Sequence, residues 1–147
     1  MGKTFRGSAI IAGNVDGEAL VTQRGFNTLA CFYRSMLTEA QEAICSDQGN
    51  PDLFGKNLTG KIICLPKSVG STSAGATWDR VAHQGIAPKA MLFSQHIDSL
   101  TAAGLILADV WVGKKIYAVD QLGDEFLAWV KEGDRIAIRE DGTVTVE

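Results

Sequence analysis

The sequence lacks any long run of apolar residues, and this absence argues against a protein that crosses a membrane. Its longest apolar stretches, such as 105–108, hold only a few residues, whereas a membrane-spanning helix needs about 20. Residues 1–6 also lack the apolar core of a secretory signal. We therefore expect no membrane partner and a cytoplasmic location.

The sequence also lacks an excess of charge of either sign. Its 14 lysines and arginines and 17 aspartates and glutamates give a formal net charge of −3. Because proteins that bind nucleic acid usually present a basic surface, no nucleic-acid partner is expected. The 147 residues, of which 46% are apolar, suffice for one domain with its own core, which we place at 1–147.

Cysteine and histidine are scarce, which limits disulfide and metal chemistry. Cys31, Cys45 and Cys64 are odd in number, widely separated and without a Cys-x-x-Cys pair. The two histidines, His83 and His96, lie in different segments. We therefore predict no metal site in this chain, with the three thiols packed as small apolar side chains.

The apolar pattern predicts an α/β chain with a β-rich core and helices on its surface. Short apolar runs bounded by turn residues predict strands at 8–13, 19–22, 62–65, 90–93, 105–108, 116–119, 135–139 and 143–146. Apolar residues spaced three and four apart predict helices at 29–44, 76–84, 100–103 and 126–130. The first two strands are expected to flank a turn at 14–17.

Turn and cap residues mark several of these boundaries. The pair Asp141-Gly142 predicts a tight hairpin between the last two strands. Gly85 is expected to end the helix at 76–84. Asp98 or Ser99 is expected to cap the next helix, with Gly104 closing it.

The loop Gly70-Ser71-Thr72-Ser73-Ala74-Gly75 is the strongest candidate for a functional site. It joins the strand at 62–65 to the helix at 76–84. Such a loop gathers backbone N–H groups at the positive end of a helix dipole, where they can hold an anion or an ionised hydroxyl. Ser71 is the candidate catalytic residue, although any of the three hydroxyl residues is also a good helix cap.

Several stretches, taken in order between about residues 7 and 146, resemble the aconitase X swivel domain. They are NPDLFGK (50–56), TGK (59–61), GST (70–72), APKA (87–90), IDSLTAAG (97–104) and GDRI (133–136). The resemblance implies an aconitase-like swivelling β/β/α domain. It also implies the small subunit of a hydro-lyase that is active only with a large subunit, which carries an iron or iron–sulfur centre. The scarcity of metal ligands in this chain agrees with that division.

The resemblance also implies roles for individual residues. Ser71 would be the base that removes the proton beside the carboxylate of a small hydroxy acid. An alkoxide at Ser71 needs several hydrogen-bond donors, and the N–H groups of Thr72 and Ser73 are the nearest candidates. Gly70, Thr72, Ser73 and Asn27 are the expected substrate-binding residues. A turn or cap role for Asn27 stays open.

Val69 is the residue that decides which substrate the sequence predicts. Family members that act on a phosphorylated mevalonate typically carry Gly-Arg-Gly-Ser or Gly-Lys-Gly-Ser where this chain has Ser68-Val69-Gly70-Ser71. Without a guanidinium there, the loop lacks a forked donor to phosphate. The resemblance therefore favours the branch that dehydrates cis-3-hydroxy-L-proline to a pyrroline-2-carboxylate. A phosphomevalonate dehydratase subunit, a non-catalytic module for small anions and a purely structural subunit stay open as alternatives.

Overall fold

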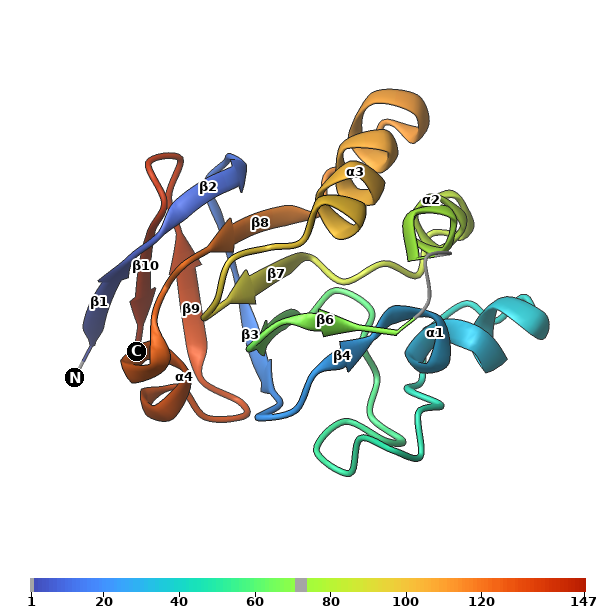
Figure 1. Cartoon of the computed structure of the whole chain (residues 1–147), viewed down its shortest axis with the longest axis horizontal. Coiled ribbons are helices and arrows are strands. Elements are labelled where there is room, and N and C mark those ends of the chain that lie inside the picture. The colour runs from blue at the N-terminus through green and yellow to red at the C-terminus, as the bar shows by residue number, and fades with distance from the viewer. Residues whose placement is uncertain (1, 71–73) are drawn as a thin grey trace.

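Within residues 2–70 and 74–147, which the computed structural model describes, an eight-stranded mixed sheet carries helices on its faces (Figure 1). In spatial order its strands are β1 (Lys3–Arg6), β10 (Thr143–Val146), β9 (Arg135–Ile138), β3 (Val15–Val21), β5 (Ile62–Leu65), β7 (Ala90–Phe93), β8 (Tyr117–Asp120) and β2 (Ser8–Ile11). The helices are α1 (Thr28–Leu37), α2 (Ala74–Gln84), α3 (Ser99–Leu107) with its π-helical continuation η1 (Ala108–Val112), and α4 (Asp124–Trp129).

Gly7 connects the two edges of this sheet. It alone separates β1, which pairs with β10, from β2, which pairs with β8. Its N–H donates to the carbonyl oxygen of Gly142 at 3.0 Å. A Cβ at Gly7 would lie 2.3 Å from the carbonyl oxygen of Asp120, so only glycine fits there. The sheet is therefore nearly closed, which leaves little free strand edge.

The central parallel strands are apolar on both faces because both faces are covered. On β5, Ile63 and Leu65 join the core beneath α1, α2 and α3, whereas Ile62 and Cys64 join a second core that includes residues of α4. Figure 1 shows α1, α2 and α3 together on one side of the sheet and α4 near β9 and β10. No helix in the described part of the chain is long and apolar enough to span a membrane.

The three cysteines lie in the core as free thiols, as predicted. A hydrogen bond with the Cys45 thiol, together with burial, raises the pKa of Cys31 above its ordinary value. Burial raises the pKa of Cys64 in the same direction. The thiols of Cys31 and Cys64 therefore stay protonated at neutral pH and act as apolar filling.

The local turn signals are confirmed. β9 and β10 pair antiparallel around Gly142, which has φ +89°. Gly85 ends α2 with φ +81°. Asp98 caps α3, because its Oδ2 accepts a hydrogen bond from the Thr101 N–H at 2.9 Å. These signals depend on neighbouring residues alone, which is why the sequence reveals them.

The strand predicted at 105–108 is wrong, because these residues lie in α3 and η1. Gly104 lies inside the helix and does not close it. A Cβ at Gly104 would lie 2.9 Å from the Cα of Gly75, so the glycine serves the close packing of α3 against α2. Residues on both sides of α3 are apolar, which hides the helical period.

Two further expectations are wrong. The helix predicted at 29–44 ends at Leu37, where the N–H and hydroxyl of Thr38 both bond to the Arg34 carbonyl. The first two strands do not form a hairpin, and the predicted turn at 14–17 is not there, because residues 15–17 belong to β3. β2 pairs with β8, and β3 lies between β5 and β9. The closure at Gly7 carries β2 to the far edge of the sheet, which no local signal indicates.

Candidate active site

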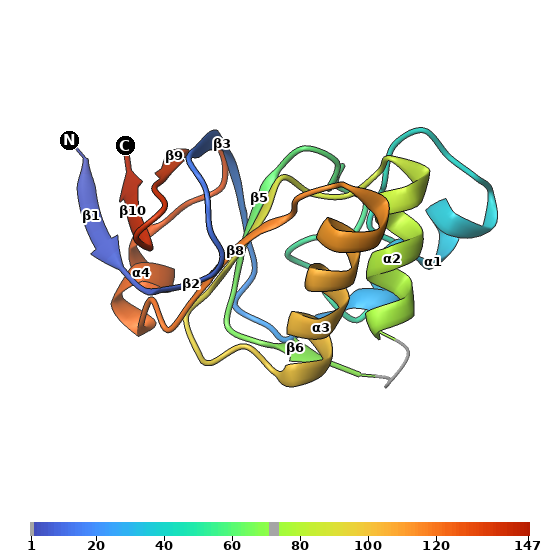
Figure 2. The ribbon, with the colours of Figure 1, turned by 90° about the horizontal axis from the view of Figure 1, so that it is seen from above.

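A small two-stranded sheet brings the starts of two helices together. β4 (Phe26–Asn27) runs parallel to β6 (Ser68–Val69), with Asn27 opposite Val69. β4 leads directly into α1, and β6 precedes the segment that leads into α2. In Figure 2, β6 and the starts of α2 and α3 lie at the same end of the molecule.

Gly70 lies against the side chain of Asn27. Gly70 has φ +102°, a conformation that favours glycine. A Cβ at Gly70 would lie 2.8 Å from Nδ2 of Asn27. Asn27 caps α1, because its Oδ1 accepts from the Ala30 N–H at 3.1 Å. The cap role is therefore confirmed. Nδ2 has no acceptor among the described residues, so it remains available as a donor beside Gly70.

The predicted catalytic serine, Ser71, lies outside the described residues. Ser71, Thr72 and Ser73 fall between Gly70 and the start of α2, and their predicted roles stay predictions. The flanks on both sides are described. On the far side, a Cβ at Gly75 would lie 3.8 Å from the Leu100 carbonyl oxygen, so the start of α3 is adjacent.

The charges around this site favour an anionic ligand. Asn27, at the positive end of the α1 dipole, lies against Gly70, and the positive end of the α2 dipole begins at Ala74, four residues later in the chain. The cap of α1 is a neutral amide, which leaves that positive end without a balancing charge. Arg24 and Lys67 are exposed on the segments that lead into β4 and β6. Near α3 the Asp98 carboxylate already occupies the helix start. Charges of this kind favour a carboxylate over a cation as a ligand.

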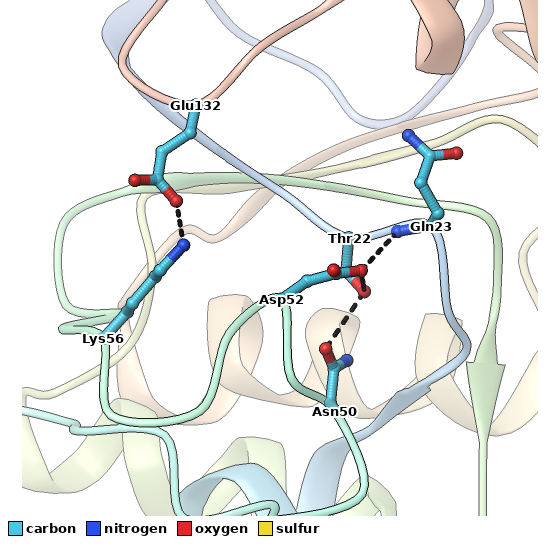
Figure 3. Close-up of polar contacts among 6 residues, drawn as sticks. All are labelled: Thr22, Gln23, Asn50, Asp52, Lys56 and Glu132. Carbon is cyan, nitrogen blue, oxygen red and sulfur yellow. Dashed lines mark hydrogen bonds and ion pairs between the residues drawn. The ribbon is translucent and has the colours of Figure 1, made fainter.

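The stretch 50–56 holds the segment before β4 in place through the contacts that Figure 3 shows. Oδ2 of Asp52 accepts from the Thr22 hydroxyl at 3.0 Å and from the Gln23 N–H at 2.9 Å. Oδ1 of Asn50 also accepts from the Thr22 hydroxyl, at 3.2 Å. Lys56 forms an ion pair with Glu132. The contacts of Asp52 and Asn50 fix Thr22 and Gln23, which lead into the Gly25–Asn27 segment.

Replacing Asp52 with alanine is expected to lower the free energy of unfolding by about 1–3 kcal/mol, because the buried Thr22 hydroxyl and the Gln23 N–H lose a charged acceptor. Denaturant unfolding measures the change. The control is Asp47→Ala, which removes a carboxylate whose hydrogen bond is local, to the Gly49 N–H. Equal losses in the two variants would contradict the role of Asp52.

A groove of about 930 Å³ begins at Asn27 and runs along α1. Its second wall is residues 46–49. Tyr33 and Leu37 line this groove, and their side chains are 54% and 69% exposed. The sequence does not indicate the groove, because its two walls come together only in the folded chain.

No group of three or more histidine, cysteine, aspartate or glutamate side chains within residues 2–70 and 74–147 is arranged to hold a metal ion. The described donor set therefore does not fit an iron centre.

Comparisons with known proteins agree with this architecture. The sequence model of the aconitase X swivel domain family matches residues 4–146. The chain is 26% identical over 137 residues to the phosphomevalonate dehydratase small subunit of Archaeoglobus fulgidus, covering 93% of this chain and 92% of that one. It is 28% identical over 142 residues to the protein of the same name from Aeropyrum pernix, covering 97% and 92%.

Two solved structures share the fold. The crystal structure of Thermococcus kodakaraensis aconitase X in its holo-form superposes with a TM-score of 0.81 at 23% identity, covering 99% of this chain and 98% of that one. The solution NMR structure of a UPF0107 protein superposes with a TM-score of 0.79 at 25% identity, covering 99% of each. The expected swivel fold is confirmed. The hydroxyproline branch stays a prediction, since the relatives from Archaeoglobus fulgidus and Aeropyrum pernix carry the name of the alternative, phosphomevalonate dehydratase.

Proposed function

Since the chain belongs to the aconitase X swivel domain family, we propose that it is the small subunit of an iron-dependent dehydratase whose active site forms with a large subunit. Its relatives from Archaeoglobus and Aeropyrum are named dehydratase small subunits, which supports a hydro-lyase built from two chains. The described residues do not fit a metal. We therefore assign the iron or iron–sulfur centre implied by the family to the large subunit.

The contact between Gly70 and Asn27 is the observation that carries this proposal. The Nδ2 group of Asn27 lies next to Gly70, the residue that precedes Ser71 in the chain. Among the described residues this N–H donor has no acceptor. In the proposed reaction, Asn27 Nδ2 donates to the substrate carboxylate and Ser71 accepts the proton from the carbon beside it. The electron pair of the broken C–H bond forms the C=C bond. The C–O bond breaks, and the leaving hydroxyl takes up one proton and departs as water. Ser71 then releases the proton that it accepted, so that each cycle removes one water and returns Ser71 to its ionised form.

The alkoxide of Ser71 requires a dry site with several donors. The N–H groups of Thr72 and Ser73 are the proposed donors, at the positive end of α2. Closure of the large subunit over the loop excludes water and strengthens these interactions. The small subunit alone is therefore expected to be inactive.

We propose cis-3-hydroxy-L-proline as the substrate on the basis of Val69. A Cβ at Gly25 would lie 2.4 Å from Cγ1 of Val69, so this side chain packs on the segment that leads to Asn27. The position offers a short apolar group and no donor to phosphate. A ring substrate whose only anionic group is a carboxylate fits beside this apolar side chain better than a phosphorylated substrate does.

Phosphomevalonate is the second candidate, and the names of the relatives favour it. The assembled complex is expected to turn over cis-3-hydroxy-L-proline with a kcat/KM at least about 100-fold above that for phosphomevalonate, because an unpaired phosphate is costly to desolvate. Steady-state assays on both substrates measure the ratio. Turnover of phosphomevalonate alone would overturn the substrate, and turnover of neither would favour a non-catalytic anion-binding module.

A further inference from the structure

We propose that the outer face of α3 and η1 is a docking surface for the large subunit, an inference that rests on the proposed two-subunit enzyme. Five large apolar side chains define this face, which we call the α3 stripe. They are Leu100, Ile106, Leu107, Val110 and Trp111. Their exposed fractions range from 38% to 79%, the highest at Trp111.

The spacing of the α3 stripe is that of a helix-packing seam. Leu100, Leu107 and Trp111 are seven and four residues apart, and Val110 lies one residue before Trp111. Side chains at such intervals lie on one side of a helix. A helix that is apolar on all sides is typical of a buried position. In the free chain the outer side of α3 is instead exposed.

The inner side of α3 is already occupied, so the stripe is a separate surface. Gly104 packs against Gly75 and the Trp78 side chain of α2, and Leu105 and Ala108 are buried in the core beneath the helices. Ile106 and Leu107 fall between these two buried residues in the sequence, but their side chains are partly exposed. The exposed apolar side chains are therefore not needed to attach α3 to the sheet.

The stripe carries almost no charge of its own. Asp109 is the one charged residue between Ser99 and Gly113. Its carboxylate accepts from the Lys115 ammonium at 3.0 Å, so its charge is balanced within the chain. The partner surface is therefore expected to be apolar and without a lone charge, because an unpaired charge buried against the stripe would be strongly unfavourable.

The size of the stripe favours the large subunit over a second copy of this chain. Five side chains of at most about 200 Å² each, roughly half exposed, offer about 500 Å². A stable interface buries about 800 Å² on each partner. Two stripes packed on each other fall short of this area, whereas a partner that also covers the adjoining site buries more than the stripe alone.

The position of the stripe points to the same partner. Its first residue, Leu100, has its carbonyl oxygen next to Gly75, at the far flank of the loop that holds Ser71. Figure 2 shows α3 running from the end of the molecule where β6 lies. A large subunit that closes over the loop therefore meets the beginning of the stripe. Docking along α3 would fix the position of the large subunit relative to the loop when the two subunits close.

The test measures assembly with the large subunit of the same organism, without substrate. Trp111→Glu and Val110→Glu each place a charge in the stripe and are expected to raise the dissociation constant at least about 30-fold, as at an interface hot spot. The thermal unfolding of the free chain should not change, because both side chains are mainly exposed. Trp129→Glu is the matched control, since Trp129 is exposed on α4 in the other layer, and it should bind as the wild type does.

Wild-type affinity in both stripe variants would overturn the proposal, and so would a wild-type chain that does not bind the large subunit. Sedimentation of the free chain tests the other occupant. If the free chain is a dimer and Trp111→Glu makes it a monomer, the stripe binds a second copy of this chain. That result would contradict docking of the stripe on the large subunit. Because assembly is measured without turnover, a failure of the proposed substrate leaves this result unaffected.

Discussion

Replacing Ser71 with alanine is expected to lower the turnover of the assembled complex at least about 1,000-fold, because the variant lacks the group that accepts the substrate proton. Assembly with the large subunit should be unchanged, since alanine removes a single oxygen atom. Initial rates of dehydration and the dissociation constant of the complex, measured on the same preparation, separate these two effects.

Ser68→Ala is the matched control for this prediction. Ser68 lies in β6, three residues before Ser71, and its buried hydroxyl has no hydrogen-bond partner in the described part of the chain. Removal of a buried hydroxyl without a partner is nearly neutral for stability, so turnover should stay within a few-fold of wild type. If Ser71→Ala retained activity at that level, the serine would be a helix cap and not the base.

Replacing Gly70 with alanine is expected to have the second-largest effect, a loss of turnover of about 100-fold or more. The new Cβ would lie 2.8 Å from Nδ2 and 2.9 Å from Cγ of Asn27, so the amide must move. Movement of the amide withdraws a proposed donor to the substrate carboxylate and weakens the cap of α1. We expect an accompanying loss of about 1–3 kcal/mol of stability from the cap and the positive φ.

Gly60→Ala separates backbone strain from the collision with Asn27. Gly60 has φ +71°, but a Cβ there would meet no atom within 4 Å. This variant should lose some stability and keep its turnover. Asn27→Ser in the Gly70→Ala background supplies a shorter cap residue, so it should recover stability without recovering activity. Equal turnover in Gly70→Ala and Gly60→Ala would contradict the role of the Gly70–Asn27 contact.

The parts of the fold that depend on adjacent residues could be predicted from the sequence. The Asp141-Gly142 hairpin, the glycine that ends α2 and the Asp98 cap each follow from local backbone chemistry. The buried strands β5 and β7 were also predictable, since four-residue apolar runs are typical of strands covered on both faces.

The parts that depend on distant contacts could not be predicted. The closure through Gly7 depends on the carbonyl oxygen of Asp120, and β4 and β6 contain two residues each, too few for a pattern. The run 105–108 resembled a strand because its helix is apolar on two sides. Once the run is shown to be helical, its two exposed residues, Ile106 and Leu107, become a signal for a partner.

The candidate site shows the same division. The sequence indicated Asn27 and Gly70 separately, as a pocket or cap residue and as part of a loop. Their contact, and the cap formed by one end of the Asn27 amide, required the pairing of β4 with β6. The part played by 50–56 was also not evident, because its acceptors reach Thr22 and Gln23 far earlier in the chain.

The most direct test of the two-subunit account is the rate of cis-3-hydroxy-L-proline dehydration by this chain alone, by the iron-loaded large subunit alone and by the two together. The account predicts turnover only in the mixture, rising with added small subunit to a plateau at the stoichiometry of the complex. Turnover by the large subunit alone at the rate of the mixture would contradict it, because the base would then lie outside this chain.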